Sequence, residues 1–325
     1  MRVCVTGGTG FIGGPLVHRL LAEGATVCVL ARPSLRADDL ESSGAQVVRG
    51  HLGDSKVTAR AVKGADVVFH IAAKVNPPGT KIDFFETNSA GTECVLKASL
   101  ESGAGKVIYL SSISVYGLVR SGERIDESTG YDPAPQFRDY YAQSKIAADA
   151  LAVSFAERTG LPVVILRPGL IYGPGRPLPL GLLGFSVGRT NVVFGKPSLR
   201  VPLNYTENLL DALQLLSKLT GGGLRQFNIV DDDELTLGQY HAIVSEFQKK
   251  HTVYFPSWPL RAGVPVAEAV MRILPVERSA GASLRQVRRA LQDRWYVTQR
   301  IREETGWAPK VALRDAVQKT IEAMA

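Results

Sequence analysis

Tyr141 and Lys145 are spaced so that one side chain can change the acidity of the other. They lie in the stretch "DYYAQSK" at residues 139–145, at the start of a helical pattern. Residues four apart share one face of a helix, so Tyr141 pairs with Lys145, whereas Tyr140 is expected to pack or to line the pocket. Lowering the pKa of a phenol from ~10 to ~7 requires about 4 kcal/mol of stabilisation of the phenolate. One ammonium within ~4 Å supplies about that much at an effective dielectric constant of ~20, which predicts a general acid–base role for Tyr141.

A serine hydroxyl at the end of a predicted strand could hold a substrate oxygen against that tyrosine. The stretch "KVIYLSSISVYG" at residues 106–117 carries three serines after its apolar run. Residues at the carboxyl end of a parallel strand face the crevice where ligands bind. We favour Ser112 over Ser111 and Ser114 for binding a carbonyl or carbinol oxygen. The alternative is a serine that only caps a turn.

The first residues of the chain combine a strand, a glycine-rich loop and a helix. In "VTGGTGFIGG", Gly7, Gly10 and Gly13 are three apart, between the strand "RVCVTG" and the helix "GPLVHRLLAEG". These glycines allow a tight turn, a close approach of the backbone to a pyrophosphate, and close packing of helix on strand. The helix N-terminus then offers free N–H groups to the phosphates. The pattern predicts a dinucleotide site, the alternative being a tight turn without a ligand.

The end of the second predicted strand indicates which dinucleotide is bound. NAD-binding proteins usually carry an acid there for the ribose 2′-hydroxyl. Here the strand ends "VLARPSLR", with no acid before Asp38 and with Arg32 and Arg36 in position for a 2′-phosphate. We therefore expect NADP(H) in preference to NAD(H). The alternatives are that NAD(H) is bound, or that both arginines are ordinary surface residues.

The remaining pattern predicts the elements that position these residues. Up to residue 172, apolar strands alternate with helices, which is typical of an α/β protein with a Rossmann-type, doubly wound parallel sheet. We expect residues 1–172 to form the dinucleotide-binding domain, with a returning segment near 200–230. Residues 173–325 are expected to form a smaller, mostly helical substrate-binding lobe. Its apolar stretch 254–275 is interpreted as core, with a substrate wall or a membrane-facing patch as alternatives.

Composition narrows the class of protein. The 325 residues have a net charge of +7, with the densest basic run at Arg285, Arg288, Arg289, Arg294, Arg300 and Arg302. At helical spacing such a run is typical of a solvated face, so we expect no nucleic-acid partner. Membrane contact is not expected either, although the basic charge leaves an anionic substrate or a membrane surface open. The three cysteines have no metal-ligand spacing, and no metal is expected. Buried reduced thiols and a strand directly after Met1 favour a cytoplasmic protein.

Several motifs together resemble the extended short-chain dehydrogenase/reductase superfamily. This is the NAD(P)-dependent epimerase/dehydratase group that includes 3β-hydroxysteroid dehydrogenases and dihydroflavonol reductases. The resemblance runs from "VTGGTGFIGG" through "VVFHIAA", "TNSAGT", "YLSSISVYG", "YYAQSK" and "LRPGLIYGPG" to "IREETGWAPKVAL". Two stretches depart from the family pattern. His51 in "GHLGD" replaces an acid that contacts adenine in many relatives, and "RVPLNYTEN" differs from the "RDFVYVDD" of sugar-nucleotide epimerases.

The resemblance implies roles for particular residues. Ser112, Tyr141 and Lys145 would form the catalytic set, with Asn88 supporting it. Lys145 would bind the nicotinamide ribose, and a homodimer would form through two helices of each subunit. The residues expected to contact the cofactor are Gly7, Thr9, Gly10, Phe11, Ile12, Gly13, Arg32, Arg36, His51, Leu52, Ala72, Ala73, Tyr141, Lys145, Pro168, Gly169 and Leu170.

Three functions fit these observations. The first is an NAD(P)-dependent oxidoreductase that moves a hydride between nicotinamide and a secondary alcohol or ketone, with Tyr141 as acid–base. The second is an NAD-dependent nucleotide-sugar epimerase or dehydratase with a retained cofactor. The third is a non-catalytic cofactor-binding regulator, which the presence of both Tyr141 and Lys145 disfavours.

Overall fold

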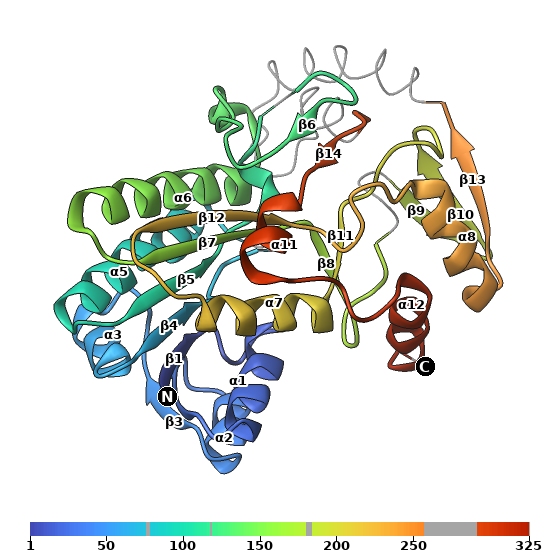
Figure 1. Ribbon diagram of the computed structural model, residues 1–325. Coiled ribbons are helices and arrows are strands. Elements are labelled where there is room, and N and C mark those ends of the chain that lie inside the picture. Colours follow the sequence, from blue (N-terminus) through green and yellow to red (C-terminus); the bar gives the residue numbers. More distant parts are fainter. Residues whose placement is uncertain (76–78, 118, 180–183, 257–290, 325) are drawn as a thin grey trace. The chain divides into compact units, whose positions relative to one another are not determined.

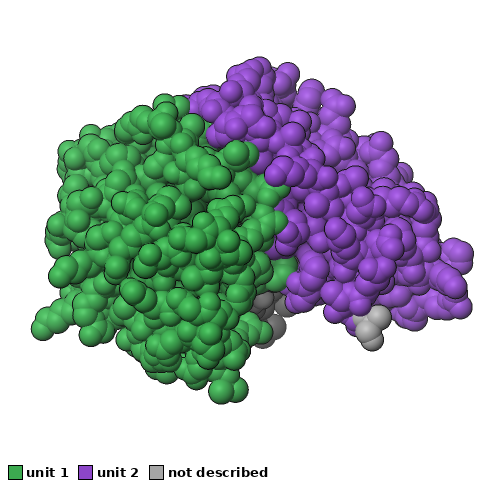
Figure 2. All heavy atoms as spheres, turned by 60° about the horizontal axis from the view of Figure 1, so that its bottom comes forward, with its two compact units in different colours: residues 1–115, 140–167, 210–227 green, residues 116–139, 168–209, 228–325 purple. Residues whose placement is uncertain are grey.

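The computed structural model describes residues 1–75, 79–117, 119–179, 184–256 and 291–324. The chain forms two compact units, which Figure 2 shows in different colours. Unit 1 contains residues 1–115, 140–167 and 210–227, and unit 2 contains residues 116–139, 168–209 and 228–325. The chain therefore passes between the units several times.

A seven-stranded sheet in the order β12-β7-β5-β4-β1-β2-β3 forms the centre of the fold. The pairs from β3 across to β7 are all parallel, which confirms the predicted doubly wound sheet (Figure 1). The strand order reverses between β1 and β4, and in such sheets ligands bind at this reversal, beyond the carboxyl ends of the strands. The strands are β1 (Arg2–Thr6), β2 (Thr26–Ala31), β3 (Gln46–Arg49), β4 (Val67–His70), β5 (Lys106–Leu110), β7 (Val163–Pro168) and β12 (Leu224–Ile229).

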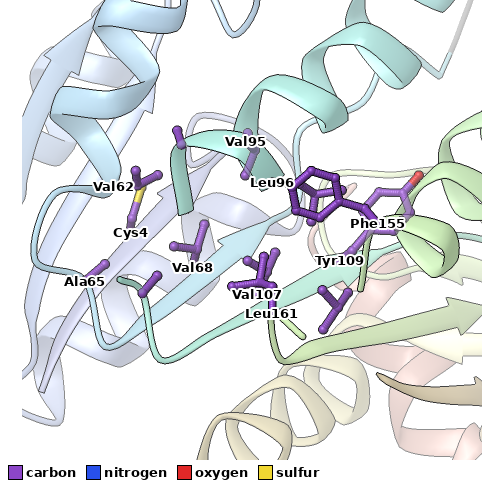
Figure 3. Close-up of a cluster of buried hydrophobic side chains, with 14 of the residues drawn as sticks. Cys4, Val62, Ala65, Val68, Val95, Leu96, Val107, Tyr109, Phe155 and Leu161 are labelled. Atoms are coloured by element: carbon purple, nitrogen blue, oxygen red, sulfur yellow. The ribbon is translucent and has the colours of Figure 1, made fainter. Parts of the chain in front are cut away.

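Helices cover both faces of this sheet. The helices are α1 (Gly13–Ala22), α2 (Leu35–Ser42), α3 (Ser55–Val62), α4 (Lys81–Phe85), α5 (Gly91–Glu101), α6 (Tyr140–Thr159) and α7 (Thr206–Lys218). On one face, α3, α5 and α6 bury apolar side chains such as Val62, Leu96 and Phe155 against the strands (Figure 3). On the other face, Arg19 of α1 forms an ion pair with Asp211 of α7 at 2.6 Å. Both faces of the strands are therefore buried, which explains their nearly continuous apolar sequences.

The helical segment around Asn88 is irregular where it leads into α5. A single π-helical turn, η1 (Glu86–Ala90), joins α4 to α5. The turn contains the buried Asn88, whose side-chain amide bonds both backbone groups of Lys74. Such π-turns are frequent at functional sites, and the amide hydrogen bonds explain why this one forms here.

Unit 2 contains three small sheets as well as helices. Strands β9 (Gly184–Val187), β10 (Thr190–Phe194) and β13 (His251–Phe255) form one sheet, β8 (Leu170–Tyr172) pairs with β11 (Leu203–Tyr205), and β6 (Arg124–Ile125) pairs with β14 (Trp295–Tyr296). The described helices are α8 (Leu237–Gln248), α11 (Gln299–Thr305) and α12 (Leu313–Glu322). A mostly helical lobe is expected from the sequence, which did not predict these strands, because runs of two to five residues leave little periodic signal.

Two sequence interpretations concern particular parts of unit 2. Most of the apolar stretch 254–275 lies outside the described residues, as do Arg285, Arg288 and Arg289. The expectation of a solvated basic face is wrong for Arg294, which is 4% exposed and donates to the Gly117 carbonyl at 2.8 Å. The burial is possible because the guanidinium also lies over the Tyr296 ring. None of the helices in the described ranges combines the length and the apolar character that a bilayer span requires.

Candidate active site

The pair Tyr141 and Lys145 lies in the first turns of α6. Tyr141 is half-buried, whereas Lys145 is only 2% exposed. The Lys145 ammonium donates to the carbonyl oxygen of Leu110 at 2.8 Å and to the hydroxyl of Tyr109 at 3.3 Å. Burial lowers the pKa of Lys145 to about 7, against the opposing effect of the negative charge of Asp149. Lys145 is thus a cation held at the end of β5, with a charge that is sensitive to its surroundings.

The two serines after β5 have different surroundings. Ser111 is buried and donates to Asp149 at 2.5 Å. Ser112 is half-buried, and its hydroxyl accepts the backbone N–H of Ser114 at 3.1 Å, which leaves its own proton for another acceptor. Because the Ser111 hydroxyl already serves a buried carboxylate, Ser112 is the better placed of the two for binding a substrate oxygen.

Asn88 connects the π-turn to the start of α6. Its Nδ2 donates to the Ser144 hydroxyl at 2.9 Å, and Ser144 donates to the backbone carbonyl of Tyr141 at 2.9 Å. Asn88 is 1% exposed and Ser144 is fully buried. Asn88 therefore acts on the backbone of the tyrosine, and its side chain supports the helix turn that carries the phenol.

The glycine loop between β1 and α1 has the tight geometry that a dinucleotide site needs. Gly7 has a φ of +75°, and a Cβ there would lie 2.7 Å from the backbone nitrogen of Ala72. A Cβ on Gly13 would lie 2.1 Å from the Gly7 carbonyl oxygen. The helix α1 begins after Ile12 without a side-chain cap and without an acid in its first turn. The Gly14 N–H already donates to the Gly10 carbonyl at 3.0 Å and Pro15 has no N–H, so α1 would favour a pyrophosphate mainly through the positive end of its helix dipole.

Of the two arginines after β2, Arg36 contacts this loop. Arg36 of α2 donates to the backbone carbonyl of Thr9 at 3.3 Å, and both Arg32 and Arg36 are exposed. The first acid after β2, Asp38, forms an ion pair with Arg49 at 2.6 Å. An acid held by an arginine is a poor acceptor for a ribose hydroxyl, which leaves Arg36 as the charged side chain that bonds the loop.

The other residues expected to contact the cofactor follow β3, β4 and β7. His51 is exposed and Leu52 half-buried after β3, while Asp54 caps α3 by accepting the N–H groups of Lys56 and Val57. Ala72 and Ala73 follow β4, and the Ala72 N–H donates to the Thr6 hydroxyl at 3.3 Å. Pro168, Gly169 and Leu170 belong to unit 2, where the Gly169 N–H donates to Asn204 at 2.7 Å.

The sequence match decides the family. Residues 3–229 match the family described as "NAD dependent epimerase/dehydratase family". The chain belongs to this family. The resemblance noted from the motifs is thereby confirmed, and similar proteins are named as reductases, dehydrogenases and a dehydratase.

Two curated relatives and one solved structure are similar to this chain. The chain is 31% identical to a 2-alkyl-3-oxoalkanoate reductase of Shewanella oneidensis over 72% of its length and 63% of the relative's. It is 27% identical to a dTDP-glucose 4,6-dehydratase of Streptomyces niveus over 99% of its length and 92% of the relative's. The crystal structure of gox2253 has the same fold, with a TM-score of 0.83 and 24% identity over 99% of this chain and 97% of that one.

Five buried residues near the site of this epimerase/dehydratase-family protein were not predicted from the sequence. Asp149 receives two hydrogen bonds from Arg167, at 2.6 and 3.1 Å, in addition to the one from Ser111. His70 contacts Thr92 and stacks on Tyr109. The only signal for Asp149 is its position four residues after Lys145, and His70 reads as part of an apolar strand. Within the described ranges, no cluster of His, Cys, Asp or Glu could hold a metal ion.

Proposed function

We propose that the protein is an NADP(H)-dependent oxidoreductase that interconverts a ketone and a secondary alcohol. The observation that carries this proposal is the buried Lys145, four residues from Tyr141 on α6 and anchored at the end of the strand that leads to Ser112. The bound nicotinamide would supply or accept the hydride at the carbinol carbon. Tyr141 would give its phenolic proton to the carbonyl oxygen during reduction, and Ser112 would donate a hydrogen bond to the same oxygen.

The proposed preference for NADP(H) rests on charge. Arg32 and Arg36 leave positive charge beside the glycine loop, and Arg49 binds the first acid that follows β2. A 2′-phosphate is stabilised by such cations, whereas a bare ribose gains little from them. NAD(H) is the alternative, since the family is described as NAD dependent.

A carbonyl compound is the proposed substrate class because of the reductase relative. The Shewanella protein is named a 2-alkyl-3-oxoalkanoate reductase, and a 3-oxoalkanoate carries a ketone and a carboxylate. We also propose a homodimer and a cytoplasmic location. Residues 1–172, with a returning segment near 200–230, are proposed as the cofactor domain and residues 173–325 as the substrate lobe.

The test combines nucleotide identification with turnover. Mass spectrometry of nucleotide released from the denatured protein, and oxidation of added NADPH with a 2-alkyl-3-oxoalkanoate, would both be measured. We expect NADP(H) to bind and Tyr141→Phe to lower turnover by about 10²- to 10⁴-fold, while Tyr140→Phe, the matched control, stays within about twofold. Full activity of Tyr141→Phe would end the proposal.

A second candidate is a nucleotide-sugar dehydratase or epimerase. It is favoured by the similarity to the Streptomyces dehydratase, which extends over 99% of this chain. This function predicts that NAD⁺ is retained during purification and that a dTDP- or UDP-sugar is converted without net NADPH consumption. Protein that is free of NAD⁺ and inert toward such sugars would exclude it.

A further inference from the structure

A buried imidazole connects two parts of the proposed site. His70, the last residue of β4, is fully buried and has polar partners on both ring nitrogens. Its Nδ1 lies 2.8 Å from the hydroxyl of Thr6, and its Nε2 lies 2.8 Å from the hydroxyl of Thr92. Burial lowers the pKa of His70 to about 3, and the positive charge of Lys145 acts in the same direction. The ring is therefore neutral at any working pH, and it serves no proton transfer in the proposed mechanism.

The neighbouring hydrogen bonds determine which nitrogen carries the proton. Thr92 donates its hydroxyl hydrogen to the backbone carbonyl of Asn88 at 2.6 Å, so it can only accept from the ring. A neutral imidazole has one N–H, which must then lie on Nε2 and point at Thr92. Nδ1 is left as an acceptor for the hydroxyl of Thr6. That hydroxyl in turn accepts the N–H of Ala72 at 3.3 Å, so every donor in this hydrogen-bond network has an acceptor.

The two ends of this hydrogen-bond network reach different parts of the site. Thr6 directly precedes Gly7 of the glycine loop. At the other end, Thr92 bonds Asn88, which supports the first turn of α6 through Ser144. The face of the His70 ring makes a second connection to α6, through Tyr109 and Lys145.

The imidazole also contacts the surroundings of the lysine. It stacks on Tyr109 with a centroid separation of 5.3 Å and an interplanar angle of 21°. The Tyr109 hydroxyl accepts a hydrogen bond from Lys145. The imidazole ring therefore contacts residues that hold Tyr141, Lys145 and the glycine loop in place.

We propose that His70, protonated on Nε2, is a positioning residue that couples the glycine loop to α6 and so fixes Tyr141 and Lys145 relative to the cofactor. The proposal rests on the proposed acid–base role of Tyr141. The hydrogen bonds around His70 run from β1 through β4 to α5 and the π-turn, so they connect elements that belong to no single helix or sheet.

The tautomer is tested without any substrate. Long-range ¹H–¹⁵N spectra of the uniformly labelled protein resolve the five histidines, and His70→Gln assigns the signal. We expect a bare Nδ1 and a protonated Nε2, unchanged between pH 8 and about 5 because the pKa lies at about 3. A proton on Nδ1, or a ring that titrates near its ordinary pKa of about 6.5, would overturn the proposal.

The positioning role is tested with a matched set of variants on α5. Thr92→Val removes the hydroxyl at nearly constant volume, and Thr92→Ser restores it. Ser99→Ala is the control, because the Ser99 hydroxyl is buried on the same helix without a hydrogen-bond partner among the described residues. We expect Thr92→Val to lower kcat about tenfold or more, with KM for the carbonyl substrate within about twofold, while Thr92→Ser and Ser99→Ala stay close to wild type.

The outcomes separate this inference from the proposed function. A folded Thr92→Val protein with wild-type kcat, or a Thr92→Ser variant as impaired as Thr92→Val, contradicts the positioning role. Melting temperatures above the assay temperature show that kcat refers to folded protein. Full activity of Tyr141→Phe would instead contradict the acid–base role, and it would leave the tautomer of His70 unaffected.

Discussion

The ammonium of Lys145 donates to the carbonyl oxygen of Leu110 at 2.8 Å, which ties α6 to the last residue of β5. Ser112 follows Leu110 by two residues, so the proposed acid–base helix and the proposed oxygen-binding serine share one anchor. The anchor also explains how a lysine that is 2% exposed stays in place, because the cation has two hydrogen-bond acceptors in the interior.

The first prediction concerns the pH dependence of stability in the absence of nucleotide. The pKa of Lys145 is lowered to about 7 in the folded protein, whereas an unfolded lysine titrates near ~10.4. Between these values the unfolded chain binds more protons, so stability rises with pH from about 7 upward. We expect Lys145→Met to reduce this rise, measured by urea denaturation at several pH values between 7 and 9.5. Lys97→Met, at an exposed lysine of α5, should keep the wild-type slope. Equal slopes in all three proteins would contradict the lowered pKa.

The second prediction compares two neighbouring glycines in the first turn of α1. A Cβ on Gly13 would lie 2.1 Å from the Gly7 carbonyl oxygen, whereas the nearest atom to a Cβ on Gly14 is 3.4 Å away. We therefore expect Gly13→Ala to distort the glycine loop and to weaken nucleotide binding at least about tenfold. A tenfold loss corresponds to only about 1.4 kcal/mol of binding free energy. Gly14→Ala should bind normally. Calorimetric titration with NADPH and NADH measures both, and tight binding by Gly13→Ala would show that the loop does not hold the pyrophosphate.

The third prediction concerns the choice of nucleotide. If Arg32 and Arg36 bind a 2′-phosphate, replacing both by alanine removes charge-assisted hydrogen bonds worth about 1.5–3 kcal/mol each. We expect the affinity for NADPH to fall by about a hundredfold or more and that for NADH to change little. Arg60→Ala, at an exposed arginine of α3, is the control. Parallel losses for NADPH and NADH would assign the arginines to a different role.

The local parts of this fold were predictable from the sequence. The glycine loop was found because its strand, turn and helix are consecutive, and the relation of Tyr141 to Lys145 follows from the helical repeat alone. The structure places each on the expected element, β1, α1 and α6. The catalytic and cofactor roles of these residues stay predictions.

The interior contacts could not be predicted in the same way. Ser111 and Arg167 are 38 and 18 residues from Asp149, and Thr6 is 64 residues from His70. Such partners are set by strand order and by helix packing, which no spacing in one sequence encodes. The π-turn at Asn88 was missed for a related reason, because it depends on hydrogen bonds to Lys74 in a different loop.

The last prediction concerns the buried ion pair beneath α6. Asp149 is fully buried and Arg167 is 2% exposed, and the carboxylate also accepts the Ser111 hydroxyl. Asp149→Asn would leave the guanidinium buried without its counter-charge, so we expect a loss of about 3–5 kcal/mol in the free energy of unfolding. Removing both charges with Asp149→Leu and Arg167→Met should cost less than Asp149→Asn alone, because no unpaired charge stays behind.

The matched surface pair for this experiment is Glu93 with Lys97, whose side chains are 42% and 58% exposed. Glu93→Gln should cost less than about 1 kcal/mol, because solvent screens an exposed pair. Urea denaturation at constant pH measures all of these variants. A double variant less stable than Asp149→Asn would show that the pair itself stabilises the fold, beyond neutralising a charge that burial makes costly. In that case α6, β5 and β7 would depend on this ion pair for their packing as much as on the apolar core.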